Sequence, residues 1–251
     1  MTADELFQKR IKELANKAYY QNHYLYTNFL GMSEQNLFYQ ILPELGGLPY
    51  SIYGGGEYSE RQVIAFGDEA TFGYPPEYPI CCVVIEPLIA KFSDALTHRD
   101  YLGALMNLGI KREMLGDILM QDKKAYVYVI ESIAEYIIEN LTRIKHTTVK
   151  AVITEQLPEN LGREFEEWET IISSERLDVI IAAVYKLSRS QVLELFRGKR
   201  IFVNGRLNEN NSQNAKEGDV ISVRGFGKFI YDGVIYVTRK DRVRISIRKF
   251  V

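Results

Sequence analysis

Residues 175–223 read ERLDVIIAAVYKLSRSQVLELFRGKRIFVNGRLNENNSQNAKEGDVISV, and this stretch decides the fold of the C-terminal third of the chain. Apolar residues spaced three and four apart predict a helix over 176–185. Ser188 and Gln191 have the spacing of a capping box, which predicts a second helix through 192–196. Asn204-Gly205 follows the apolar run 201–203 and predicts a tight hairpin. We therefore expect two short helices followed by strands.

Four pieces of this stretch resemble the S4 (αL-type) RNA-binding domain. They are RLD at 176–178, LSRSQ at 187–191, RGKRIFVNG at 197–205 and EGDVISV at 217–223. In that family the paired helices and the following hairpin form a basic face that binds structured RNA. The resemblance implies RNA contacts by ten side chains, Arg176, Ser188, Arg189, Ser190, Gln191, Arg197, Lys199, Arg200, Asn204 and Arg206. For Ser188 alone, a purely structural role as a helix cap is the stronger interpretation.

The charge distribution points to a polyanion as the partner. Residues 174–251 contain 16 Lys and Arg against eight Asp and Glu, a formal charge of +8. Residues 1–79 carry −5, residues 80–153 carry 0 and residues 154–173 carry −5. Lys and Arg groups bind nucleic acid by releasing counterions from the phosphate backbone. A basic third on an acidic chain therefore predicts RNA binding, with a solvated basic surface as the alternative.

Basic residues continue beyond residue 223, beginning with Arg224 and Lys228. The apolar runs 229–231 and 234–238 flank Asp232-Gly233, which predicts a hairpin. The last strand alternates, with three apolar residues on one face and polar residues on the other, Arg242, Arg244, Ser246 and Arg248. We expect its arginines to extend the RNA-binding surface, and an edge strand protected by charge is the structural alternative.

Residues 80–153 predict the element order β-α-β-β-α-β, a ferredoxin-like (RRM-like) domain. Its helices begin after two predicted capping boxes, Thr97 with Asp100 and Ser132 with Glu135. Tyr126 and Tyr128 share one face of the third strand and are placed to stack on bases. The glycines of the RNA-recognition signature are missing, however, and any half-buried strand gives the same alternation.

The remaining segments complete an α+β chain of four parts. Residues 1–79 predict a helical and hairpin region, with helices over 3–20 and up to residue 42 and a turn at Gly54-Gly55-Gly56. Residues 80–153 form the ferredoxin-like domain. Residues 154–173 predict an acidic, partly helical linker. Residues 174–251 form the S4 domain with extra β-strands.

Residues 96–113 read LTHRDYLGALMNLGIKRE, a sequence that resembles the YlmH-type proteins. The order of the predicted domains along the chain resembles that family as well. That family places an RNA-recognition-like region before a C-terminal S4 domain. Its members bind the large ribosomal subunit and are implicated in rescuing stalled translation, where peptidyl-tRNA remains on that subunit. In Gram-positive bacteria they are linked to a cell-division gene cluster. The resemblance implies rRNA or tRNA as partner, ribosome-associated quality control as function, and His98 and Arg99 as a second RNA or partner surface.

Features of catalytic and metal sites are weak in this sequence. The three histidines, His23, His98 and His146, lack metal-ligand spacing, and Cys81 and Cys82 are neighbours that cannot build a disulfide framework. We expect a non-enzymatic RNA-binding factor without metal or cofactor. We also expect a cytoplasmic monomer that binds neither DNA nor membrane, since no run of 18 apolar residues occurs.

Two other functions remain open at this point. An RNA-modifying enzyme, of pseudouridine synthase or rRNA methyltransferase type, would use the S4 domain for targeting. Arg176-Leu177-Asp178 has the letters around the catalytic Asp of the synthases, although no separate catalytic domain surrounds it. A protein-interaction adaptor tethered to RNA is the second alternative.

Overall fold

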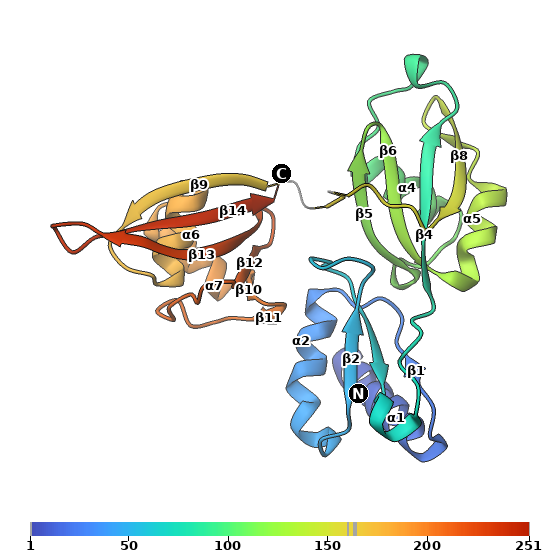
Figure 1. Ribbon diagram of the computed structural model, residues 1–251, viewed down its shortest axis with the longest axis horizontal. Coiled ribbons are helices and arrows are strands. Elements are labelled where there is room, and N and C mark those ends of the chain that lie inside the picture. Colours follow the sequence, from blue (N-terminus) through green and yellow to red (C-terminus); the bar gives the residue numbers. More distant parts are fainter. Residues whose placement is uncertain (1, 160, 163–164, 251) are drawn as a thin grey trace. The chain divides into compact units, whose positions relative to one another are not determined.

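A computed structural model describes residues 2–159, 161–162 and 165–250 of the 251-residue chain (Figure 1). The chain forms two compact units, Met1–Gly162 (unit 1) and Arg163–Val251 (unit 2). Both units combine helices with sheets, which confirms the predicted α+β class. Among the described residues, every helix is too short or too polar to cross a membrane.

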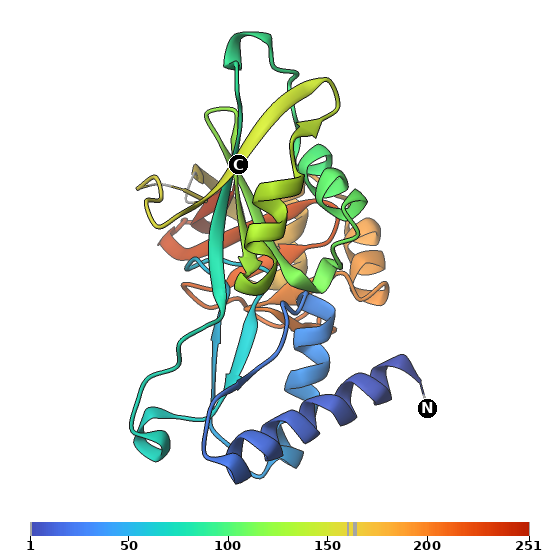
Figure 2. The same cartoon turned by 90° about the vertical axis from the view of Figure 1, so that its right-hand side faces the viewer.

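The first part of unit 1 packs two helices against a small antiparallel sheet of order β1-β3-β2 (Figure 2). Its elements are α1 (Ala3–Gln21), β1 (Leu25–Tyr26), α2 (Met32–Ile41), β2 (Tyr50–Tyr53), β3 (Val63–Phe66) and the one-turn α3 (Glu69–Phe72). Strands β2 and β3 are antiparallel, so the predicted hairpin around the three glycines is confirmed. Ile11, Phe38 and Ile64 are buried where the helices meet the sheet.

The second part of unit 1 is a five-stranded sheet with strand order β5-β6-β4-β8-β7. Its elements are β4 (Ile80–Pro87), α4 (His98–Asn107), β5 (Leu115–Gln121), β6 (Lys124–Ile130), α5 (Ala134–Asn140), β7 (Arg143–Ile144) and β8 (Thr147–Thr154). All neighbouring strands are antiparallel. Helices α4 and α5 cover one face of this sheet, where Val83, Leu105 and Ile137 form part of a buried cluster (Figure 1). Strand β7 is too short to show a pattern in the sequence.

One of the two capping boxes predicted in this part is confirmed. Thr97 and Asp100 form the box at the start of α4. The box predicted from Ser132 and Glu135 is wrong. The chain leaves β6 directly into a 3₁₀ turn, Glu131–Ile133, so α5 begins at Ala134 without a side-chain cap.

Part of the other face of the five-stranded sheet, around Cys82 and Tyr128, is covered by the first part of unit 1. Phe29 and Val63 belong to one buried cluster with Cys82, Tyr126 and Tyr128. The fit is close at Gly116, where an added Cβ would lie 2.7 Å from the Phe29 ring. Residues 1–79 and 80–153, which the sequence separates, therefore share a core.

Arg61 connects the two parts of unit 1 by hydrogen bonds. Its Nε donates to the Leu115 carbonyl at 2.8 Å, and its Nη2 donates to the Phe29 and Arg112 carbonyls at 2.8 and 3.2 Å. The Asp117 carboxylate accepts the backbone N–H of Arg61 at 3.2 Å. Burial lowers the pKa of Arg61, and burial together with the Arg61 charge lowers the pKa of Arg112 to about 10. The junction thus depends on a guanidinium largely removed from water.

Unit 2 packs α6 (Leu177–Tyr185) and α7 (Arg189–Arg197) against a six-stranded sheet of order β11-β10-β12-β13-β14-β9 (Figure 1). The strands are β9 (Phe165–Ile172), β10 (Ile201–Val203), β11 (Arg206–Leu207), β12 (Val220–Val223), β13 (Gly227–Val237) and β14 (Val243–Phe250). Ser188 and Gln191 form the predicted capping box. Asn204 and Gly205 have φ of 50° and 75°, as a tight two-residue hairpin requires, so that prediction is also confirmed.

The predicted linker is wrong where residues 165–172 form β9. This strand pairs antiparallel with β14 over its whole length. Trp168 and Ile172 face the core of unit 2, while Glu167 and Glu169 lie on the outer face. The high acid content masks this strand alternation in the sequence. Residues 160, 163 and 164 of the predicted linker lie outside the described residues.

The hairpin predicted at Asp232-Gly233 is also wrong, because β13 continues through these residues as a β-bulge. Gly233 takes a φ of +97°, and the Asp232 carboxylate accepts hydrogen bonds from Arg248 of β14 at 2.8–3.1 Å. The chain reverses farther along, where the Thr238 N–H donates to the Arg242 carbonyl. Residues 234–243, called the arm below, project from the core and expose Val234 through Val237 (Figure 1).

Replacing Arg61 by Met should destabilise unit 1 by about 2 kcal/mol, because the Phe29 carbonyl loses its Arg61 donor and the Leu115 and Arg112 carbonyls each lose one of two donors. Hydrogen exchange of the β3 and β5 amides in urea measures this loss. Trp168 is the only tryptophan and lies in unit 2, so its fluorescence transition should not move. Lys17→Met on the exposed face of α1 is the matched control, and equal protection in both variants would contradict the role given to Arg61.

Candidate nucleic-acid interface

Three of the predicted RNA-binding arginines are engaged by carboxylates. Arg176 pairs with Asp178 at 2.7 Å, Arg244 with Glu169 at 2.7 Å and Arg248 with Asp232 at 2.8 Å. The outer face of β14 is therefore largely neutralised and does not form the predicted row of available cations. The edge-strand alternative is wrong too, since β14 lies between β13 and β9.

Several predicted polar contacts hold the fold of unit 2. The Asn204 amide donates to Asp219 at 2.8 Å and accepts the Val220 N–H at 2.9 Å. Ser188 and Gln191 satisfy each other's backbone N–H groups at the start of α7. The Ser190 hydroxyl lies 3.0 Å from that of Ser188. These four side chains position the helix and hairpin that carry the neighbouring cations.

The arginines of α7 remain available to a ligand. Arg189 and Arg197 stand at its two ends, both exposed, and neither forms an ion pair with any described residue. Their backbone positions are about 12 Å apart along the helix. Lys199 lies 3.7 Å from Glu209, a pair in which both side chains are mostly exposed and which is therefore weak. Arg206 is exposed on β11.

Three further predicted cations meet aromatic rings at the turn between β12 and β13. The Arg200 Nη2 donates to the Arg224 carbonyl, and its guanidinium lies 5.8 Å from the centroid of Phe226. Arg224 lies 5.2 Å from the Phe202 ring and Lys228 lies 4.4 Å from the Phe250 ring. We call Tyr185, Arg200, Arg224, Phe226, Lys228 and Lys249 the Phe226 cluster.

Phe226 itself is the residue that the sequence reasoning missed. Its side chain is 40% exposed. The Arg200 guanidinium lies beside the ring, which therefore does not belong to an apolar patch. The signal for it was a single aromatic residue between Gly225 and Gly227, flanked by Arg224 and Lys228.

Arg242 does not join the Phe226 cluster. The register of β13 with β14 runs from Phe229↔Lys249 at one end to Val237↔Val243 at the other, a span of about 26 Å for eight residues. Arg242 therefore lies at the tip of the arm, together with Arg239 and Lys240. The single basic face expected from the sequence is divided into two surfaces.

Tyr126 and Tyr128 are not placed to stack on bases, and this prediction is wrong. They are only 9% and 6% exposed, because Phe29 and Val63 cover their face of the sheet. Burial raises the pKa of Tyr128 to about 12. The alternation of Tyr and Val along β6 reflects a strand buried on both faces.

Comparison with known proteins shows what the chain is similar to. Residues 77–157 match the family described as "Putative RNA-binding domain in YlmH". The chain is also 28% identical over 226 residues to the "Ribosome-associated protein quality control protein P2" of Bacillus subtilis (strain 168), covering 89% of this chain and 86% of that protein. The chain is thus similar to YlmH-family proteins. The "Cell division protein ylmH from Streptococcus pneumoniae" is a solved structure with 24% identity and a TM-score of 0.49, matching 61% of this chain and 93% of that one.

The domain that matches the family model has a polar groove on its helical side. Arg99 of α4 lines a groove of about 410 Å³ together with Asn107, Asn140, Arg143 and Lys145. His98 is exposed in the first turn of the same helix. Lys145 also forms an ion pair of 2.7 Å with Asp100. Hydrogen bonds from Lys145 and Thr97 lower the pKa of Asp100 to about 2, so the groove holds three cations and one carboxylate.

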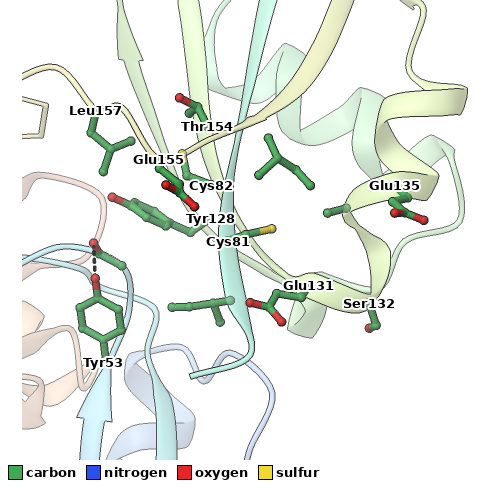
Figure 3. Close-up of a pocket in the computed structure, with 14 residues that line it drawn as sticks. Tyr53, Cys81, Cys82, Tyr128, Glu131, Ser132, Glu135, Thr154, Glu155 and Leu157 are labelled. Atoms are coloured by element: carbon green, nitrogen blue, oxygen red, sulfur yellow. Dashed lines mark hydrogen bonds between the residues drawn. The ribbon is translucent and has the colours of Figure 1, made fainter. Parts of the chain in front are cut away.

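A larger cavity of about 600 Å³ lies where the tip of the β2–β3 hairpin meets the five-stranded sheet (Figure 3). Glu131, Glu135 and Glu155 contribute carboxylates to its lining and would repel phosphate. Burial raises the pKa of Cys81 to about 11 and that of Cys82 to about 12, so both thiols stay protonated near neutral pH and are weak nucleophiles. The chemistry of this cavity does not suit nucleic acid.

Asp178, which occupies the Asp position of the Arg-Leu-Asp sequence found around the catalytic Asp of pseudouridine synthases, has a structural role in α6. It is 4% exposed and accepts hydrogen bonds from Arg176 at 2.7 and 3.0 Å and from Asn211 at 3.3 Å. Within the described part of the chain, no three His, Cys, Asp or Glu side chains are grouped to hold a metal ion.

Replacing Lys145 by Met should raise the pKa of Asp100 from about 2 toward its ordinary value of about 3.8. The folded-state pKa is depressed, so the ionised carboxylate stabilises the helix start at neutral pH, and this stabilisation is lost as the pH falls toward 2. NMR titration of the side-chain carboxyl carbon measures the change. Lys150→Met, which removes a partner of Glu86 instead, should leave Asp100 unaltered. An unchanged Asp100 titration in Lys145→Met would contradict the pairing.

Proposed function

We propose that this protein is a non-enzymatic factor that binds structured RNA through unit 2. The observation that carries the proposal is the Phe226 cluster beside the exposed arginines of α7, which together place cations and an exposed ring on unit 2. Positive groups attract the phosphate backbone without reading sequence, and structured RNA offers shape, phosphates and 2′-hydroxyls for contact. The acidic charge elsewhere in the chain limits nonspecific binding.

The arrangement of elements supports the finer assignment of the two parts. Two helices followed by the β10–β11 hairpin are the order expected of an S4 domain, extended here by β13, β14 and β9. The order β5-β6-β4-β8 is the one expected of a ferredoxin-like, RRM-like domain. Both modules occur in RNA-binding proteins, although fold alone assigns no function.

We further propose that the RNA is rRNA or tRNA on the large ribosomal subunit, and that the process is ribosome-associated quality control. The name of the Bacillus subtilis relative, which is similar over nearly the whole chain, supports this. The matched RNA-binding domain supports it as well. On this proposal the protein acts as a cytoplasmic monomer.

The groove around Arg99 is our candidate for a second RNA contact. Because Tyr126 and Tyr128 are buried, contact by the matched domain would use other residues. The groove offers Arg99, Arg143 and Lys145, and His98 lies beside it on α4.

Sedimentation with purified ribosomal subunits tests the ribosomal part of the proposal. The full chain should sediment with the large subunit and not with the small one, and crosslinks from unit 2 should map to one rRNA or tRNA segment. Equal sedimentation with both subunits, or crosslinks spread over unrelated helices, would refute the assignment.

Arg189→Ala combined with Arg197→Ala should weaken RNA binding irrespective of RNA sequence. The slope of log affinity against log salt should fall by roughly 1 unit per lost phosphate contact. Filter binding to a hairpin RNA over a salt series measures both quantities. The control, Lys9→Ala with Lys17→Ala, removes the same charge from α1 and should leave them unaltered. If the two double variants behave alike, the binding surface is not on α7.

A further inference from the structure

Three aromatic rings connect the core of unit 2 to its surface. Phe229 is fully buried, and the Tyr185 ring lies 6.0 Å from it in an edge-on arrangement. Phe226 lies 5.5 Å from Tyr185 on the other side and is 40% exposed. The column of rings therefore ends at the surface on an aromatic side chain.

The position of Tyr185 is fixed by ring packing. Its hydroxyl is buried and makes no hydrogen bond with any described group, which is an unfavourable arrangement for a phenol. Its ring nevertheless contacts Phe226 and Phe229, and Lys249 lies 5.7 Å from its centroid. Tyr185 therefore acts as the support beneath Phe226.

The turn that carries Phe226 needs a glycine on each side of it. Gly225 and Gly227 take φ of +84° and +117°, values that other residues rarely adopt, and the Phe226 N–H donates to the Val223 carbonyl at 2.9 Å. A Cβ on Gly225 would lie 2.5 Å from the Arg200 Nη2. The two glycines therefore allow the turn that exposes Phe226 and the close approach of Arg200 to it.

One cation lies against this exposed ring, and others lie against neighbouring rings. The Arg200 guanidinium is 5.8 Å from the Phe226 centroid. Lys249 is 5.7 Å from the centroid of Tyr185, the ring that contacts Phe226. Arg224 and Lys228, two positions to either side of Phe226, lie against Phe202 and Phe250. An exposed aromatic ring with cations nearby suits a ligand with a flat π-system and negative charge beside it. A nucleotide combines these two features in one residue.

We propose that Phe226 stacks on a single unpaired base of the bound RNA, while the cations of the Phe226 cluster contact the adjoining phosphates. This inference rests on the proposed RNA-binding function and adds to it a preference for RNA with an extruded nucleotide. An acidic peptide would match the charge but would leave the ring without a partner, so a nucleotide is the better occupant.

Binding of the full chain to three short RNA hairpins tests the proposal. One hairpin carries a bulged adenosine, the second is fully paired, and the third has an abasic site at the bulge. The unmodified protein should bind the bulged adenosine about tenfold more tightly than the other two, the range expected for stacking of one base. Phe226→Leu should lose this preference, while Phe226→Tyr should keep it.

The combination of variant and RNA separates stacking from a general loss of binding. Phe226→Leu and the abasic site should each weaken binding about tenfold, and together no more than either alone, because both remove the same contact. If Phe226→Leu weakens binding to all three hairpins equally, or to none, the stacking proposal is overturned while RNA binding stands.

If the unmodified protein binds none of them, the proposed function fails. Displacement of the RNA by poly-glutamate without any preference for the bulge would favour an acidic protein partner and overturn stacking. Circular dichroism should show both variants folded, since Phe226 lies at the surface.

Discussion

The pairing of β9 with β14 determines which basic groups of unit 2 are available to a partner. It places Glu167 and Glu169 on the same outer face as the arginines of β14, and Arg244 pairs with Glu169. Asp232 lies at the bulge of β13, on the opposite side of β14 from β9, and forms an ion pair with Arg248. Each exposed ion pair stabilises the fold only weakly, because solvent screens the two charges. Their combined effect is electrostatic, because they offset the charge of the arginines on the outer face of β14.

A comparable constraint acts in unit 1, where the first 79 residues supply the cover for part of one face of the five-stranded sheet. Phe29 and Val63 bury Tyr126 and Tyr128, and Arg61 ties the cover to β5 through the Leu115 carbonyl. The two tyrosines are therefore not an open platform for bases. The end of the same face that carries Lys124, Lys150 and Val152 remains exposed, and on the helical side Arg99 and Arg143 line a groove.

The elements that the sequence predicts correctly are those encoded by neighbouring residues. The capping boxes of Thr97 with Asp100 and of Ser188 with Gln191, and the Asn204-Gly205 turn, all depend on contacts within three positions. Apart from the Ser132–Glu135 capping box, which fails within its own turn, the failures depend on partners distant in sequence. Asp232-Gly233 reads as a turn but becomes a bulge because Arg248 binds the aspartate. Residues 165–172 read as an acidic linker, and only their pairing with β14 shows them to be a strand. For the same reason, local spacing identified the cations of the site but could not tell which of them meet carboxylates.

Cation–π packing gives the Phe226 cluster a property that an ordinary basic patch lacks. A lysine or arginine on a flexible stem loses side-chain freedom when it binds phosphate, which weakens the interaction. Arg200, Arg224 and Lys228 already rest against rings, and Arg200 is also held by the Arg224 carbonyl. Much of their ordering therefore occurs when unit 2 folds rather than when it binds. A surface organised in this way favours a ligand whose charges and flat rings match fixed positions, and the irregular parts of a folded RNA meet that condition better than a uniform duplex does.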